Sequence, residues 1–391
     1  MSYDYDKLSL KLHKKLSGKI SISSKINIKD IKDLSTFYTP GVAAVSKEIA
    51  KNVCKVWKYT SRKNLVAVVT DGSAVLGLGN IGPEAAHPVM AGKALLFKEF
   101  ADIDAFPICL DSQEPEDIIK TCKLIAPSFG GINLEDISAP RCFQIESALQ
   151  GIGIPVMHDD QHGTAVVVLA GLINATKIVG KKLEDCKIII NGPGAAGTAI
   201  ALAISEFTNK KAKIIALDEH GVVCTKKDVN KRKICQAVSK NTIYSKLDIA
   251  IEDADIFIGV SVGNVLSKEN IKSMARDSIV FAMANPVPEI DPRIAHSAGV
   301  AIMATGRSDY PNQVNNVLAF PGIFRGALDA NATKITPEML LVASLALSRC
   351  VKKPIATKIL PDALEKSVVI KIARAVKTQA IKQGVSRPKC T

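Results

Sequence analysis

The chain of 391 residues contains 47% hydrophobic and 23% charged residues, a composition typical of a globular protein large enough for two domains. No apolar run reaches the roughly 18 residues that span a bilayer, and the N-terminal segment MSYDYDKLSLKLHKK lacks the apolar core of a secretory signal. We therefore expect a cytoplasmic protein with no membrane segment. The net charge is +13, but aromatic residues make up only 5% and the lysines are dispersed, which predicts attraction of small anions and no nucleic-acid partner.

Residues 1–60 are polar and predicted to be helical. From Leu65 onward, short apolar segments alternate with longer amphipathic ones, a pattern typical of a mostly parallel sheet covered by helices. The predicted strands of this part are 65–70, 103–110, 131–135 and 154–158, and the predicted helices lie near 83–100, 114–126, 140–150 and 161–178.

A second series of strands follows the polar connector VGKKLEDC. These strands are predicted at 187–191, 212–218, 254–260, 278–285 and 300–306. We predict an α/β protein with two domains: an N-terminal parallel-sheet substrate domain with a helical N-terminal segment (1–178) and a Rossmann-type dinucleotide-binding domain (179–335). The helices of 336–391 are predicted to pack back on the first domain.

The nine cysteines show no CxxC pair and no spacing typical of a zinc site. Most have apolar neighbours, so we predict reduced thiols in the core. They are Cys54, Cys109, Cys122, Cys142, Cys186, Cys224, Cys235, Cys350 and Cys390.

The segment NGPGAAG (191–197) matches the dinucleotide fingerprint G-x-G-x-x-G in its full context. It follows a predicted strand directly and leads into an apolar helix, and Asp218 ends the next strand 21 residues after the last glycine. Glycines there let the backbone approach a pyrophosphate, and the acid can bind a ribose hydroxyl. The predicted cofactor-binding residues of this region are Gly192, Gly194, Ala195, Ala196, Gly197 and Asp218.

A second match, GLGNIG (77–82), is separated from its strand by the six residues DGSAVL. The tight turn from strand to helix is therefore missing, and we interpret this segment as a loop that needs positive φ angles and can line a pocket.

Acidic side chains follow two predicted strands. Glu135 and Asp136 follow one, and Asp159 and Asp160 follow the other. Because ligands of open α/β sheets bind at the carboxyl ends of the strands, these oxygens can hold Mg²⁺ or Mn²⁺. The residues alone equally allow solvated loop acids, with Asp160 as a helix N-cap. The neighbouring histidines are not predicted to be ligands.

Seven segments of the chain resemble, in order, the sequence blocks of malic enzymes of the short prokaryotic type, over about residues 35–380. The segments are FYTPGVAAVSKEIA, VVTDGSAVLGLGNIGPEAAHPVMAGKALLFKEFADIDAFPICLD, GINLEDI, HDDQHGTA, GPGAAG, MANPVPEI and NNVLAFPGIFRGAL.

This resemblance implies oxidative decarboxylation of (S)-malate to pyruvate and CO₂ with NAD⁺ or NADP⁺ and Mg²⁺ or Mn²⁺, and also decarboxylation of oxaloacetate. By motif match, it implies Lys93 and Tyr38 as catalytic residues, with Asp159 beside the lysine. A base near neutrality is needed at the malate hydroxyl, and a buried lysine beside a metal can have its pKa lowered. The residues implied for metal and malate are Glu135, Asp136 and Asp160 for the metal, and Asn285 and Asn316 for malate, Asn285 also lying against the cofactor.

The chain also departs from the larger malic enzymes. They carry an arginine in the loop that reads DGSAVLGLG here, so the malate carboxylate needs another partner, such as backbone amides. Small relatives are homodimers whose N-terminal segment crosses to the neighbour, which implies that Tyr38 is donated in trans. Asp218 favours NAD⁺, whereas Lys226 and Lys227 could bind the 2′-phosphate of NADP⁺.

Parts of the sequence are also compatible with three other functions. An amino-acid dehydrogenase would keep the fingerprint and a lysine but would not need the acidic cluster. An oxaloacetate decarboxylase would need the metal but would not reduce a nicotinamide. A binding protein for anions or nucleic acid, built on an inactive enzyme fold, would use the positive charge alone.

Overall fold

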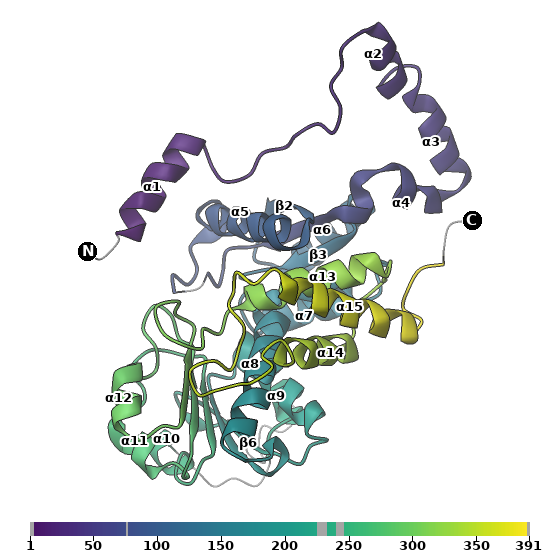
Figure 1. The fold of residues 1–391 in the computed structure, drawn as a ribbon. Helices are drawn as coiled ribbons and strands as arrows, with labels where there is room; N and C mark the ends of the chain where they lie inside the picture. The colour runs from purple at the N-terminus through teal and green to yellow at the C-terminus, as the bar shows by residue number, and fades with distance from the viewer. Residues whose placement is uncertain (1–3, 76, 225–232, 240–245, 389–391) are drawn as a thin grey trace.

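The computed structural model describes residues 4–75, 77–224, 233–239 and 246–388. Two sheets with flanking helices form the body, and an arm of N-terminal helices projects from it (Figure 1). None of the first three helices buries a residue. The N-terminal helices are α1 (Tyr5–Leu16), α2 (Ile31–Phe37), α3 (Val42–Lys51) and α4 (Val56–Tyr59).

The first sheet has four parallel strands in the order β2-β1-β3-β4. One of its two inner strands, β1, is apolar from its first residue to Val69 because both faces are covered. Val66 and Val68 pack in one core cluster with α5, whereas Ala67 and Val69 pack in another with α6 and α7. The elements are β1 (Leu65–Thr70), β2 (Asp104–Cys109), β3 (Gly131–Leu134), β4 (Val156–His158), α5 (Gly82–Ala101), α6 (Pro115–Ile125) and α7 (Arg141–Leu149).

The second sheet has the order β10-β9-β8-β5-β6-β7 and is parallel except for its short edge strand β7. Helix α9 covers one face, and the shorter helices α10 and α11 cover the other. The elements are β5 (Lys187–Asn191), β6 (Lys213–Asp218), β7 (Gly221–Val222), β8 (Ile256–Gly259), β9 (Ile279–Ala282), β10 (Ile302–Thr305), α9 (Ala195–Phe207), α10 (Leu247–Ala250), α11 (Lys268–Ser273) and α12 (Pro292–Ser297).

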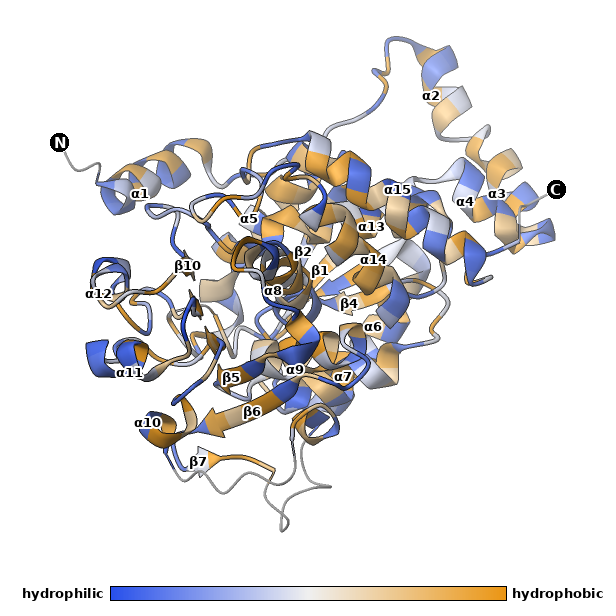
Figure 2. Ribbon diagram, turned by 60° about the horizontal axis from the view of Figure 1, so that its bottom comes forward, coloured by the Kyte–Doolittle hydropathy of each residue, from blue (hydrophilic) through white to orange (hydrophobic). Residues whose placement is uncertain are grey.

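Helix α8 (Asp159–Ile178) joins the two sheets and is buried along most of its length. After its polar first turn it is mostly apolar on every side, as expected of a helix surrounded by other elements, and Figure 2 shows it near the centre of the molecule. Within the described residues, no helix has the length and apolarity needed to cross a bilayer.

Three C-terminal helices complete the body. Helix α15 packs against α13 and α14, while α13 also contacts α5 and α14 contacts α8. The C-terminal helices are α13 (Phe320–Asp329), α14 (Pro337–Ser348) and α15 (Ser367–Lys382). The short 3₁₀ helices are Val53–Lys55, Ser61–Asn64, Ala126–Ser128, Leu183–Asp185, Lys233–Gln236 and Asn316–Leu318.

The structure confirms the predicted α/β class and each of the nine predicted strands, with bounds that differ by at most three residues. Helix α8 begins at Asp159, two residues before the predicted start, because the chain turns into the helix directly after β4. The two aspartates therefore belong to a first helical turn and not to a loop.

The prediction that every cysteine is reduced is wrong. Cys224 and Cys235 form a disulfide, and Cys54 is also disulfide-bonded. Cys224 and Cys235 are both buried, and the fold brings their Cα atoms to 5.4 Å from each other, within the range that a disulfide requires. A separation of 11 residues carries no motif, so only the folded chain reveals the pairing. Cys109, Cys122, Cys142, Cys186 and Cys350 are free, and Cys390 lies outside the described residues.

Phe97 links α5 to α13 through two edge-to-face ring contacts. Its ring centroid lies 4.8 Å from that of Phe320 and 5.3 Å from that of Phe324, and all three side chains are fully buried. Such pairs stabilise beyond the area they bury.

Replacing this ring should destabilise the fold strongly. We expect Phe97→Ala to cost about 3–5 kcal/mol, because it removes the ring contacts and leaves a cavity. Thermal unfolding followed by circular dichroism measures the effect. Leu124→Ala is the control, since Leu124 is 70% exposed and should change stability little. Equal melting temperatures for the two variants would contradict the role given to Phe97.

Candidate active site

Four acidic residues gather where β3 and β4 end. These strands pair in parallel with Leu134 opposite His158, so the residues that follow each strand lie side by side. Glu135, Asp136 and Asp159 are each less than 5% exposed. Parallel pairing thus brings the first pair, Glu135 and Asp136, next to the second pair, Asp159 and Asp160, across 23 to 25 residues of sequence.

Lys93 of α5 reaches into this acidic group. Its Nζ lies 2.7 Å from Asp159 Oδ2 and 2.8 Å from Glu135 Oε1, and it sits 4.4 Å from the centre of the Phe320 ring. The side chain is buried. The structure therefore brings Lys93 and Asp159 together, as the motif match predicted.

Glu135, Asp136 and Asp160 each offer an oxygen within 4.8 Å of the others, an arrangement suited to one divalent cation. The backbone N–H of Asp136 donates to Asp160 Oδ2 at 2.8 Å, and Asn133 Nδ2 donates to Glu135 Oε2 at 2.8 Å, so two of these carboxylates are held in place. Asp136 Oδ2 is buried and accepts no hydrogen bond from any described residue. A buried acceptor left without a donor fits a bound cation.

The alternative of solvated loop acids does not agree with this burial. Asp159 is fully buried, and the N-cap of α8 is His158, without a side-chain capping bond. Asp160 therefore does not cap the helix. The acids instead gather at the carboxyl edge of the first sheet, where three of them are buried and the Asp160 side chain is 32% exposed.

Burial and mutual repulsion disturb the ionisation of this group. Burial, followed by the charges of Asp160 and Glu135, raises the pKa of Asp136 to about 9. Burial also raises the pKa of Glu135 to about 7, although Lys93 opposes the shift. Without a cation, the cluster holds protons at neutral pH.

The pKa of Lys93 differs from the expectation for a base. Burial alone would lower this pKa, but the charges of Asp159 and Glu135 outweigh burial and raise it. The lysine is thus a cation in the metal-free site. A positive ion on the neighbouring carboxylates would cancel much of the field that holds this proton.

A glycine and a buried glutamate support the first turn of α8. A Cβ at Gly163 would overlap Asp159 Oδ1 and lie 3.3 Å from Asn316 Cβ. Glu146 accepts hydrogen bonds from the backbone N–H of His158 at 3.0 Å and lies 2.9 Å from His162 Nε2. Burial lowers the pKa of His158 to about 4, so this histidine is neutral. His158 Nε2 lies 3.7 Å from Asp160 Oδ2, and neither histidine belongs to the three-acid group.

A cavity of about 470 Å³ opens beside the acids and is shared by the two sheets. Asp136, Asp160, Asn285 and Asn316 line it together with Gly77. The described lining residues include no arginine or lysine, so backbone amides and side-chain amides are the groups available to a carboxylate there. Gly77, Gly79 and Gly82 have φ angles of 74°, 75° and 78°, which confirms that GLGNIG is a loop.

The dinucleotide fingerprint forms the turn between β5 and α9. Gly192 has φ 108°, and a Cβ there would run into the carbonyl oxygen of Val260. A Cβ at Gly197 would overlap the carbonyl oxygen of Gly192, so both positions need glycine. Helix α9 starts at Ala195, earlier than the sequence suggested, and Gly194, Ala195 and Ala196 line the same cavity as Asn285.

Asp218 ends β6, as predicted, and its Oδ1 accepts a hydrogen bond from the backbone N–H of His220 at 3.0 Å. Lys226 and Lys227 lie outside the described residues.

Tyr38 is not brought to Lys93 within one chain. It follows α2 on the projecting arm and is 67% exposed (Figure 1). The predicted residues that the structure does bring together are Lys93, Glu135, Asp136, Asp159, Asp160, Asn285 and Asn316.

Sequence reasoning missed Asp71 and Arg141. Asp71 is fully buried after β1, accepts hydrogen bonds from the backbone and hydroxyl of Ser73, and lies 3.4 Å from Arg141 Nη2. The Ser73 hydroxyl accepts from the backbone N–H of Ser138, next to the cavity. The rule that singled out Glu135, an acid directly after a buried strand, would also have found Asp71.

Comparison with known proteins agrees with this geometry. A family model described as "Malic enzyme, N-terminal domain" matches residues 17–150, and one described as "Malic enzyme, NAD binding domain" matches residues 161–381. A protein named NAD-dependent malic enzyme from Geobacillus stearothermophilus is 53% identical over 95% of this chain and 78% of its own length.

A bifunctional malic/malolactic enzyme from Bacillus subtilis is 49% identical over 97% of this chain and 94% of its own length. The crystal structure of a malic enzyme from Pyrococcus horikoshii superimposes with a TM-score of 0.93 at 46% identity, covering 99% of this chain and 93% of that one. The two family models together cover most of the chain. The chain therefore belongs to the malic enzyme family of nicotinamide-dependent oxidoreductases.

Proposed function

We propose that this protein oxidatively decarboxylates (S)-malate to pyruvate and CO₂ with NAD⁺ or NADP⁺, and that it needs Mg²⁺ or Mn²⁺. The observation that carries the proposal is the buried Lys93, held 2.7 Å from Asp159 and 2.8 Å from Glu135, beside three carboxylates that can share a cation. The names of the relatives, which include NAD-dependent and NADP-dependent malic enzymes, support the same reaction.

Glu135, Asp136 and Asp160 are the proposed metal ligands. A divalent ion held there would polarise the C2 oxygen of malate and later accept electron density as CO₂ leaves, which also supports decarboxylation of added oxaloacetate. The oxygens are hard ligands without a sulfur or imidazole among them, which suits Mg²⁺ or Mn²⁺.

Lys93 is the proposed base for the C2 hydroxyl proton. It has the reach, because it already bonds two acids of the cluster, and Phe320 below it excludes water from one side. Asp159 orients the ammonium group and offers a carboxylate next to the departing proton.

Asn285 and Asn316 are proposed to bind malate from the second sheet's side of the cavity. Both line the cavity together with the metal-ligand candidates Asp136 and Asp160. With no cationic side chain in the described lining, the carboxylate of malate would bind these amides and the backbone of the glycine loop at Gly77. A Cβ at Gly77 would lie 3.4 Å from the carbonyl oxygen of Asn285, so this loop closely approaches the asparagine.

NAD⁺ is the proposed cofactor, with NADP⁺ as the alternative. Asp218 at the end of β6 would bind a ribose hydroxyl and repel a 2′-phosphate. Gly192, Gly194 and Gly197 are proposed to bind the pyrophosphate, with Ala195 and Ala196 supplying amides of the first turn of α9. We also propose the division into a malate- and metal-binding domain at 1–178, a nucleotide-binding domain at 179–335 and C-terminal helices at 336–391.

The enzyme is proposed to act as a homodimer in which Tyr38 completes the partner's site and protonates C3. The arm that carries it is rich in exposed apolar side chains, which need a partner surface. Ile22, Ile31, Phe37 and Tyr38 are each more than half exposed.

Malate and either nicotinamide should give reduced cofactor, measured by absorbance, only when Mn²⁺ or Mg²⁺ is present. Lys93→Ala should lower kcat by at least about 10²-fold, because it removes the base. The matched control is Lys98→Ala on the same helix. Lys98 pairs with Asp102 and Asp104 on the surface, so this variant should keep the wild-type kcat. Activity that persists in the presence of a metal chelator would contradict the metal-dependent mechanism and favour a metal-free dehydrogenase.

Manganese should bind more tightly as pH rises from about 6 to 9. Metal must displace the protons that Asp136 and Glu135 retain, since their pKa values are raised to about 9 and about 7. The metal-free protein should also become less stable as pH rises from about 6 to 9. The raised pKa values mean that its folded state binds more protons than its unfolded state, and these protons are lost as pH rises. Calorimetric titration at three pH values measures the affinity. Asp136→Asn should flatten its dependence on pH; an unchanged slope in this variant contradicts the assignment.

Mixing two inactive variants tests donation of Tyr38 in trans. Lys93→Ala and Tyr38→Phe homodimers, unfolded together and refolded, should recover up to about one quarter of wild-type activity, because half the dimers are mixed and each holds one intact site. A mixture of Lys93→Ala with Asp136→Asn should recover none, since both residues belong to the same chain's site. Recovery in neither mixture would indicate that Tyr38 acts within its own chain.

A further inference from the structure

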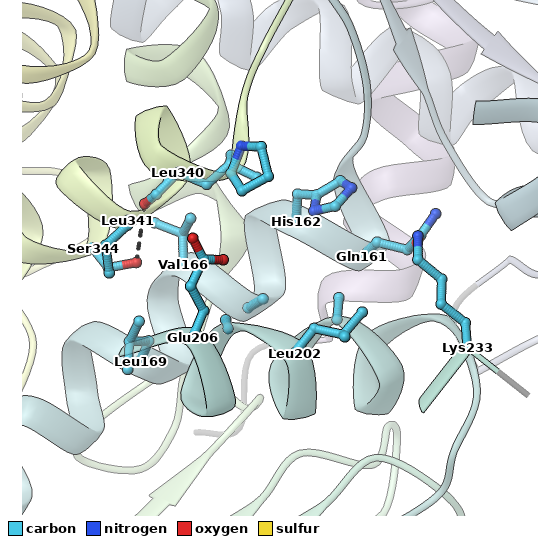
Figure 3. A pocket seen from close by; sticks show the side chains of 14 residues that line it. Gln161, His162, Val166, Leu169, Leu202, Glu206, Lys233, Leu340, Leu341 and Ser344 are labelled. Carbon is cyan, nitrogen blue, oxygen red and sulfur yellow. Dashed lines mark hydrogen bonds between the residues drawn. The ribbon is translucent and has the colours of Figure 1, made fainter. Parts of the chain in front are cut away.

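A second cavity, separate from the one proposed to bind malate, lies between α8, α9 and α14. Its volume is about 230 Å³, and its walls are mainly apolar. Leu202 of α9 and Leu340 and Leu341 of α14 are only partly buried, so these leucines line a recess instead of closing it. Figure 3 shows them around the recess, with Leu169 of α8 at its base. A space of this size suits a small ligand with an aliphatic body.

One end of this cavity is lined by Gln161, whose amide oxygen is a buried acceptor without a partner in the described part of the chain. Gln161 is 1% exposed, and its Nε2 donates to Glu146 Oε2 at 3.3 Å. Its Oε1 is buried and has no hydrogen-bond partner among the described residues. Leaving a buried acceptor unpaired costs free energy, so a donor from a ligand would be stabilising there.

The same end carries a cationic side chain. Lys233 lines the cavity next to Gln161 and His162, and its Nζ lies 5.4 Å from the centre of the Phe143 ring (Figure 3). No ion pair joins it to a described carboxylate. His162 is engaged with Glu146 at 2.9 Å, which leaves Lys233 as the cation able to meet an anion.

The opposite end is acidic. Glu206 of α9 lies there near Ser344, whose hydroxyl donates to the carbonyl of Leu340 at 3.2 Å. Figure 3 shows Glu206 on the far side of the recess from Lys233. A carboxylate ligand would therefore bind in one orientation, with its charge toward Lys233 and its aliphatic body along the leucines.

We propose that this cavity is a second ligand site for a small aliphatic carboxylate that carries a hydrogen-bond donor at C2, either a hydroxyl or an ammonium group. The carboxylate meets Lys233, the donor meets Gln161 Oε1, and a branched chain of four or five carbons contacts Leu169, Leu202 and Leu341.

The site is positioned to influence the acidic cluster. Gln161 and His162 belong to the first turn of α8, directly after Asp159 and Asp160. Both contact Glu146, which also binds the backbone N–H of His158. A ligand that holds Gln161 therefore acts on the turn that carries two of the cluster's carboxylates, and its occupancy should change the affinity for Mn²⁺.

Three probes test the proposal by calorimetry or ligand-detected NMR with the full chain. They are 2-hydroxy-4-methylpentanoate, leucine and 4-methylpentanoate, which has no donor at C2. We expect saturable binding of at least one of the first two below about 20 mM, and binding at least fivefold weaker for 4-methylpentanoate. The first two probes separate a hydroxy acid from an amino acid as the preferred class.

Two variants locate the bound probe. Leu202→Trp should abolish binding by filling the recess, and Lys233→Gln should weaken it at least fivefold by removing the cation. Leu124→Trp and Lys123→Gln on the exposed side of α6 are the matched controls and should bind as the wild type does. Lack of binding by all probes, or binding unchanged in Leu202→Trp and Lys233→Gln, would overturn the site.

The link to the cluster has its own measurement. A saturating probe should change the dissociation constant for Mn²⁺ at least twofold in the wild type and not in Leu202→Trp. This titration needs neither malate nor a nicotinamide, so its outcome is independent of the proposed reaction. An affinity for Mn²⁺ that the probe does not change would overturn the coupling between the cavity and the acidic cluster. Whether the cavity binds a ligand is tested separately by the binding measurements above.

Discussion

The charge of one buried lysine, placed among four acids, is the interaction on which the rest of the structure depends. Lys93 cancels part of the repulsion between Asp159 and Glu135, but one cation cannot balance the whole group. Burial, together with the remaining negative charge, raises the pKa values of Asp136 and Glu135. A largely buried group with excess negative charge is stable only if it holds protons or a metal ion, and this supports the divalent cation proposed above.

Much of the fold could be predicted from the sequence because its strands are short apolar runs. The glycines of its strand-to-helix turn are also required by the local backbone conformation. LVAVVT and KIIIN read as buried parallel strands, and the glycine turn follows the second one directly. The acidic cluster could also be predicted, since parallel pairing places the carboxyl ends of β3 and β4 side by side. These inferences use only neighbours along the chain and one rule of sheet geometry.

Other features depend on contacts that no local pattern records. Sequence alone left the acids equally open to solvation, and only the burial of Asp159 separates the two interpretations. The Cys224–Cys235 disulfide joins a strand end to a 3₁₀ helix, and residue spacing does not show it. The first turn of α8 is supported by Glu146, which lies on a different helix, α7. The exposed position of Tyr38 likewise depends on how the arm leaves the body, which its own motif does not specify.

Gly163 shows how the demands of the site oppose those of the helix that contains it. Glycine inside a helix costs about 1 kcal/mol relative to alanine, yet a methyl group here would occupy the place of Asp159 Oδ1. Alanine would gain this helix propensity only by pushing Asp159 away from Lys93, and separating a buried ion pair costs more than the propensity gains. Gly163 is therefore a position where the usual stabilising exchange of a helical glycine for alanine should fail.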